Sequence, residues 1–199
     1  MNDYSLETLV SITKFRSDGR DARGTLDLFV PALKARIEVD LNLVNNNQLL
    51  PRSVDTINDI VNLSDVAYHR LLQLLYDDAL RTREEVGFVD PYRAGPLTRI
   101  GLLARLFGRK NVASVVMLSP DDPKHPCYLE DGINSVESNV EWLQFRIDEH
   151  SQTHARLCLL DCRPRWEDEH GVTTVIRNGV PIASGPYDVD FEAFDTVAP

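Results

Sequence analysis

The feature that most constrains the fold of this chain is an Asn-Gly pair, Asn178-Gly179, placed between two short apolar runs at residues 172–176 and 180–182. Both residues tolerate the positive φ that a type I′ turn requires, so the pair predicts a β-hairpin. Shortly before it, residues 157–160 read Leu-Cys-Leu-Leu and place apolar side chains on both faces of an extended segment. A strand of this kind is buried on both sides. The sequence therefore predicts a central strand followed by a hairpin.

A second β signal lies in residues 36–43, where polar and apolar side chains alternate strictly. Such alternation gives one face to a core and the other to water, which is typical of an antiparallel meander. The polar positions are Arg36, Glu38, Asp40 and Asn42, and the apolar positions are Ile37, Val39, Leu41 and Leu43. Further strands are expected at residues 9–15, 25–30, 112–118 and 142–147, with a polar loop at 16–24.

One strong helix signal begins at Ser64-Asp65, a good N-cap, and runs to about Arg83. Its apolar side chains fall on one broad face of a 3.6-residue period, so we expect it to lie across the sheet. That face comprises Tyr68, Leu71, Leu72, Leu74, Leu75 and Ala79. A shorter helix is expected at 55–63 and an amphipathic one at 97–107. Residues 121–138, with two prolines and several acids, read as a long surface loop.

These elements predict an α+β fold in which one or two helices pack on a face of a largely antiparallel sheet. We expect a single domain over residues 1–186, in which 87–138 form an insertion or a long loop region. Residues 187–199 form an acidic C-terminal tail that Phe191 and Phe194 could pin to the body. The expected core includes Ile37, Val39, Leu41, Leu71, Leu75, Leu157 and Leu159.

The net charge of the chain limits its partners. The 199 residues carry a formal charge of −10, and residues 101–199, with 9 basic and 16 acidic groups, contribute 9 − 16 = −7. Nucleic acid and anionic membranes are therefore poor partners, whereas a cationic partner is favoured. The alternative is that the charge only maintains solubility. Because no apolar run approaches the roughly 18 residues of a membrane span and the first residues lack a signal peptide, we expect a cytoplasmic protein.

Several motifs of enzyme chemistry are missing from the sequence. No two of the 10 glycines are two positions apart, so the dinucleotide fingerprint is absent, as are the phosphate-binding loop and the nucleophile elbow. The side chains of metal-ligand type lack ligand spacing, so we expect no metal and no cofactor, and we expect buried free thiols. They are His125, Cys127, His150, His154, Cys158 and Cys162.

The most suggestive cluster is Glu167-Asp168-Glu169-His170, which follows Trp166. A carboxylate beside an imidazole is a recognisable acid–base pair. The same four residues also fit a recognition surface, or a solvated turn in which Gly171 supplies the required backbone angle. All three interpretations stay open at this point.

The order of these elements, and above all residues 162–179, resembles uncharacterised bacterial domains found among the immunity proteins of polymorphic and contact-dependent growth inhibition toxin systems. The residues that carry the resemblance are Trp166, Glu169, His170, Gly171, Asn178 and Gly179. It implies a protein that binds and neutralises a cognate toxin rather than an enzyme, and it carries over no catalytic residue.

Acidic clusters placed over a cationic active site would speed association and block access to it. The expected partner-binding residues are Asp121, Asp122, Glu130, Asp131, Glu137, Glu167, Asp168, Glu169 and His170. Two alternatives are a small hydrolase that uses His170 with an adjacent carboxylate, and a general protein-interaction domain.

Overall fold

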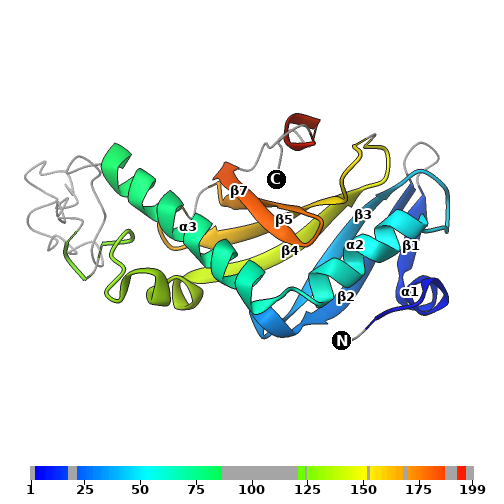
Figure 1. Ribbon diagram of the computed structural model, residues 1–199, viewed down its shortest axis with the longest axis horizontal. Coiled ribbons are helices and arrows are strands. Elements are labelled where there is room, and N and C mark those ends of the chain that lie inside the picture. The colour runs from blue at the N-terminus through cyan, green and yellow to red at the C-terminus, as the bar shows by residue number, and fades with distance from the viewer. Residues whose placement is uncertain are drawn as a thin grey trace, which may run out of the picture.

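The computed structural model describes residues 3–17, 22–86, 121–123, 125–151, 153–167, 170–186 and 192–195. Its strands form one seven-stranded sheet whose spatial order follows the chain (Figure 1). They are β1 (Lys14–Ser17), β2 (Ala22–Val30), β3 (Ala35–Leu43), β4 (Val140–Asp148), β5 (Leu157–Pro164), β6 (Val172–Arg177) and β7 (Val180–Pro186). Neighbouring strands are antiparallel except β3 and β4, which are parallel. The α+β fold with a largely antiparallel sheet is thus confirmed.

In the described part of the chain, three α-helices accompany the sheet: α1 (Leu6–Ile12), α2 (Pro51–Val61) and α3 (Asp65–Val86). The helices α2 and α3 lie between β3 and β4 in the chain and cover one face of the sheet (Figure 1). A parallel pairing needs a crossover of this kind, because the chain must return to the same end of the sheet. None of the helices among the described residues combines the length and apolarity needed to span a membrane.

The main core lies between the two long helices and the inner face of the sheet. Phe145 of β4, Val39 of β3 and Leu75 of α3 are each fully buried there. Strand β5 is also buried on its outer face, where Leu157 and Leu159 form a second, smaller cluster with Val175. The expected core residues Ile37, Val39, Leu41, Leu71, Leu75, Leu157 and Leu159 are all buried.

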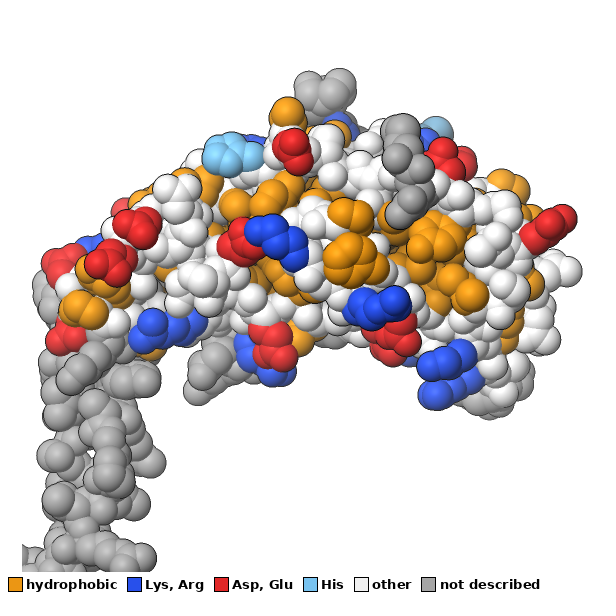
Figure 2. All heavy atoms as spheres, turned by 90° about the horizontal axis from the view of Figure 1, so that it is seen from below, with side chains coloured by type: hydrophobic (Ala, Val, Ile, Leu, Met, Phe, Trp, Pro, Cys, Tyr) orange, Lys and Arg blue, Asp and Glu red, His pale blue; other side chains and the backbone are white. Residues whose placement is uncertain are grey.

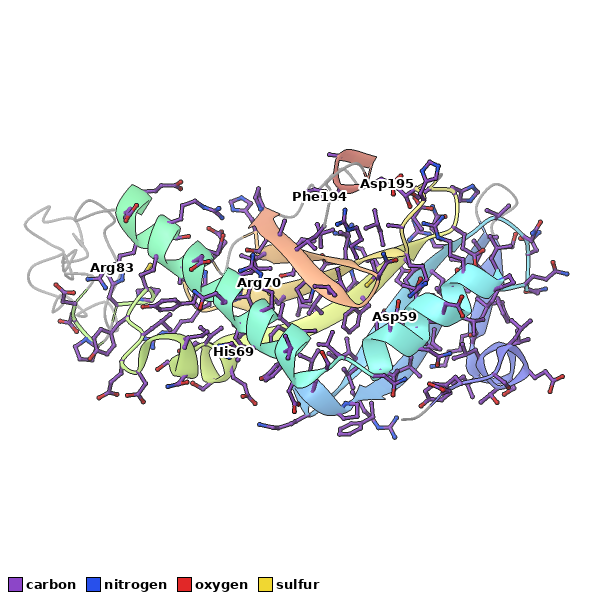
Figure 3. The ribbon with its side chains drawn as sticks, in the orientation of Figure 1. Asp59, His69, Arg70, Arg83, Phe194 and Asp195 are labelled. Carbon is purple, nitrogen blue, oxygen red and sulfur yellow. The ribbon has the colours of Figure 1, made fainter. Side chains whose placement is uncertain are left out.

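The C-terminal 3₁₀ turn η4 (Glu192–Phe194) covers part of this outer cluster. Phe194 and the following Asp195 are labelled in Figure 3. Phe194 packs against the cluster, and Asp195 accepts hydrogen bonds from the backbone N–H groups of His154 (2.8 Å) and Ala155 (2.9 Å). These two N–H groups lower the pKa of Asp195 to about 2. The expectation for Phe194 is confirmed, whereas Phe191 lies outside the described residues.

The predicted strand at residues 9–15 is wrong for residues 9–12, which belong to helix α1 (Leu6–Ile12), while residues 14 and 15 do lie in strand β1. Ser5 caps the N-terminus of α1 by accepting a hydrogen bond from the Thr8 N–H (3.2 Å), and only Leu9 is buried. Strand β1 begins two residues after the end of α1, and the predicted loop at 16–24 contains the end of β1 and the start of β2.

The predicted helix at 55–63 starts earlier, at Pro51, and the longer one runs through residues 65–86. Glu149, which follows β4, accepts hydrogen bonds from the Leu50 N–H (2.9 Å) and the Ser53 hydroxyl (2.6 Å) and so fixes the start of α2 from a distant part of the chain. The expected helix at 97–107 and strand at 112–118 lie outside the described residues.

Residues 121–138 are not simply a surface loop. This segment contains the 3₁₀ turn η2 (Gly132–Ser135) and the start of η3 (Glu137–Asn139), and it buries His125, Cys127 and Val136. It packs along α3, which provides an apolar surface that the loop reading did not anticipate. The expected hairpin is confirmed: Asn178 and Gly179 have φ values of 49° and 77° at the turn between β6 and β7.

Candidate functional site

The acidic residues expected to bind a partner fall into two groups on opposite flanks of α3. Residues 121–137 lie on the flank that carries Tyr68, Tyr76 and Arg83, and Arg83 pairs with Asp121. Trp166, Glu167 and His170 lie on the other flank, where the Trp166 indole N–H donates to Asp78 (3.0 Å). Helix α3 therefore lies between the two groups, and the expected residues do not form one continuous patch.

The group at 121–137 is mostly exposed. Glu130 and Asp131 are exposed at the loop before η2, and the Asp121 side chain is 78% exposed despite its pairing with Arg83. Asp122 is partly buried. Glu137 differs, because Lys34 donates to it (2.8 Å) and lowers the pKa of its carboxyl, and the nearby Tyr68 hydroxyl lowers that pKa further. Glu137 and Asp121 thus each pair with a basic side chain, while Glu130 and Asp131 are exposed.

Trp166, Glu167 and His170 lie beside a buried acid, Asp78. Asp78 is 4% exposed, and burial raises its pKa although Trp166 and Arg81 both hydrogen bond to it. Glu167 lies close enough to add to that rise. The His170 Nδ1 is 3.3 Å from Glu167 Oε1, but its side chain is 77% exposed on the turn. Asp168 and Glu169 lie outside the described residues.

Helix α3 itself contributes acids that sequence reasoning missed. Glu84 and Glu85 are exposed in the final turn of α3, close in the chain to Arg83, which pairs with Asp121. A negative charge there opposes the helix dipole and costs about 0.3–1 kcal/mol per residue. A sequence scan for acids at the C-terminal end of a predicted helix would have found this signal. We call Glu84, Glu85, Asp121, Glu130 and Asp131 the acidic end; Figure 2 shows acidic side chains gathered at this end of the molecule.

The three cysteines and His125 are buried, whereas the His154 side chain is 99% exposed. Burial raises the pKa of the thiols of Cys158 and Cys162, which favours inert thiols over reactive thiolates. His125 accepts a hydrogen bond from the Cys127 N–H (3.1 Å) within a buried turn. Within the described part of the chain, no group of three or more His, Cys, Asp or Glu side chains could hold a metal ion.

A separate hollow of about 410 Å³ lies on the outer face of the sheet. Arg23 of β2, Asp40 and Asn42 of β3, and Gln144, Arg146 and Asp148 of β4 line it. Beside it, the buried Asp161 of β5 binds Arg146. The sequence indicated the alternation of polar and apolar residues within β3 and within β4. It did not show the parallel β3–β4 pairing that places Asp40 opposite Arg146.

Comparisons with known proteins add one finding. A family model described as a domain of unknown function (DUF6985) matches residues 117–191. No curated protein and no solved structure matches the chain. The matched region spans β4 to β7 and contains every one of the nine residues expected to bind a partner. Residues 117–191 are therefore similar to a domain family whose function is not described.

Proposed function

We propose that this protein is a binding protein whose acidic end contacts a cationic surface of a protein partner. The observation that carries the proposal is the set of exposed carboxylates that α3 and residues 121–131 bring to one end of the molecule. The net charge of −10 supports it, because a field of that sign draws a basic partner over a distance of about a Debye length, roughly 10 Å at 0.1 M salt.

The more specific form of the proposal is an immunity protein that neutralises a toxin domain by covering its active site. It follows from the resemblance of residues 162–179 and from the physics of occlusion, in which the binder needs complementary charge and no chemistry of its own. The position of Glu84 and Glu85 also supports a binding role. Two negative charges at the C-terminal end of α3 lower the stability of the helix, and they add to an acidic surface.

The test compares three charge-reversed proteins against the partner recovered by pull-down from the native host. One carries Glu84→Lys, Glu130→Lys and Asp131→Lys, and a second carries the reversal of residues 167–169 to Lys. The control carries Glu7→Lys, Asp27→Lys and Glu38→Lys, which changes the net charge equally at a distance from α3. Association rates are measured over a salt series.

We expect the acidic-end variant to associate at least about tenfold more slowly than the control at low salt, with the difference shrinking as salt rises. Equal rates for this variant and the control at every salt concentration would remove the acidic end from the interface. A larger effect of residues 167–169 would move the interface to the other flank of α3.

The hydrolase alternative has one observation in its favour, the 3.3 Å contact between His170 and Glu167. His170→Ala separates the two functions. A binder should keep its association rate within about twofold, because the exposed imidazole contributes at most one rim contact. An enzyme that uses His170 would lose turnover by about 10²–10⁴-fold.

A further inference from the structure

The hollow on the outer face of the sheet is built from three neighbouring strands. In the parallel register of β3 and β4, Asp40 lies opposite Arg146 and Asn42 lies opposite Asp148 (Figure 1 shows the strands side by side). Arg23 of β2 approaches Asp40 from the other side, with 3.8 Å between Arg23 NH1 and Asp40 Oδ2. Charged and amide side chains therefore face one another across the strands around a volume of about 410 Å³, within the usual range for ligand sites.

Asp161 fixes the side chains at one edge of this hollow. It is 1% exposed and accepts hydrogen bonds from the Thr173 hydroxyl (2.7 Å) and the Gln144 amide nitrogen (3.1 Å), while Arg146 Nε lies 2.6 Å from its Oδ2. A buried ion pair is expensive to desolvate, and its use here holds neighbouring groups in one geometry. The charge of Arg146 is therefore compensated from within the protein.

Two amide side chains are oriented by carboxylates in the same way. Gln144 donates its amide nitrogen to Asp161, and Asn42 donates its amide nitrogen to Asp148 Oδ1 (3.0 Å). Each amide then has its carbonyl oxygen left as an acceptor. With the carboxylates of Asp40 and Asp148, the lining is rich in acceptors, and hydrogen bonds hold all of these side chains except Asp40.

The net charge of the side chains around the hollow indicates the sign of the charge that a ligand should carry. Because Arg146 and Asp161 cancel, the remaining charged groups are Arg23 against Asp40 and Asp148, a sum of 1 − 2 = −1. The 3.8 Å contact of Arg23 with Asp40 is long, and the Arg23 side chain is 62% exposed, so it is the easiest of these groups to displace.

We propose that this hollow binds the guanidinium group of an arginine side chain presented by a peptide or protein. A guanidinium offers five N–H donors in a planar fork, which suits several fixed acceptors better than the compact ammonium of lysine. The site is on the sheet, away from the acidic end, and does not depend on the proposed function.

The first test titrates the full-length protein with acetyl-Gly-Arg-Gly-amide and follows the side-chain amide resonances of Asn42 and Gln144 by NMR. The matched probe is the same peptide with citrulline, which keeps the shape of arginine and removes its charge. We expect saturable shifts of both resonances with the arginine peptide and at least about tenfold weaker binding of the citrulline peptide. Equal binding of the two peptides would overturn the proposal.

The second test uses three conservative variants that predict opposite changes. Asp148→Asn and Asp40→Asn should each weaken binding about two- to fivefold, whereas Arg23→Gln should strengthen it, because a like charge is removed. The backbone spectrum of each variant checks that the fold is kept. Weaker binding by Arg23→Gln would indicate an anionic or zwitterionic ligand and would overturn the proposal.

The third test separates the hollow from the acidic end. The variant with Glu84, Glu130 and Asp131 changed to Lys should keep the shifts of Asn42 and Gln144 with the arginine peptide. Loss of those shifts in this variant would assign the peptide to the acidic end and overturn the site in the hollow. The pull-down experiment on the proposed function can fail or succeed without altering this outcome.

Discussion

At the scale of single residues, Asp78 is the side chain with the clearest consequence for stability. Burial raises its pKa above the unfolded value of roughly 3.9, so the folded state binds its proton more tightly than the unfolded state. For an acid with a raised pKa, folding is favoured most below the unfolded pKa. The stability then falls as pH rises through the folded pKa.

Asp78→Asn removes the ionisable carboxyl, and with it the loss of stability at high pH, while keeping an acceptor for the Trp166 indole N–H. We expect the free energy of unfolding of the variant, relative to the wild type, to increase as pH rises from about 3 to 8. Denaturant unfolding at a series of pH values measures it. Asp77→Asn, at the exposed neighbouring position, is the matched control and should show no such trend. A difference that shrinks with rising pH would contradict the assignment.

The core side chains were predictable residue by residue, but the buried acids were not. Strict alternation predicted that Ile37, Val39 and Leu41 would be buried, because a strand with a period of two can place them only on one face. The burial of Asp161 and Asp78 could not be predicted from such a local pattern. Their partners Arg146 and Trp166 are 15 and 88 residues away, so only the folded chain shows why a carboxylate can be buried there.

At the scale of elements, α3 is the helix on which the main core depends. Leu75 is fully buried, and Leu71 and Ala79, one turn to either side, are buried with it. Leu80, by contrast, is 38% exposed on the same helix.

Leu75→Ala should lower the free energy of unfolding by about 2–5 kcal/mol, because it removes buried methyl groups and leaves a cavity. Leu80→Ala is the matched control and should cost less than about 1 kcal/mol. Chemical denaturation of the three proteins gives both numbers. A loss below about 0.5 kcal/mol for Leu75→Ala would mean that the buried face of α3 is assigned wrongly.

Elements were predictable where their signals are local. The hairpin at 178–179 depends on two adjacent residues, and the N-cap at Ser64 depends on one hydroxyl that accepts the Ala67 N–H (3.2 Å). Helix α2 was placed too late because its start is held by Glu149, nearly a hundred residues away, through the Leu50 N–H and the Ser53 hydroxyl. Residues 9–12 were misread because their apolar content suits a strand, while Ser5 starts a helix just before them.

At the scale of the whole molecule, stability should not depend on a metal. The three cysteines are buried free thiols, and the described residues contain no cluster of three metal-ligating side chains. We expect the same melting temperature, within about 1 °C, with and without a chelator, and no stoichiometric zinc by elemental analysis. One zinc per chain, lost together with several degrees of melting temperature, would contradict this.

The parallel junction at the middle of the sheet has a consequence for how the chain folds. Of the six pairings between described strands, five join strands with short connections, whereas the β3–β4 pairing closes the long stretch of residues 44–139. Closing a long loop costs entropy before its contacts repay it, so such pairings form late. We infer that two meanders assemble first, and that the seam where Val39 meets Phe145 sets the rate at which the protein becomes native.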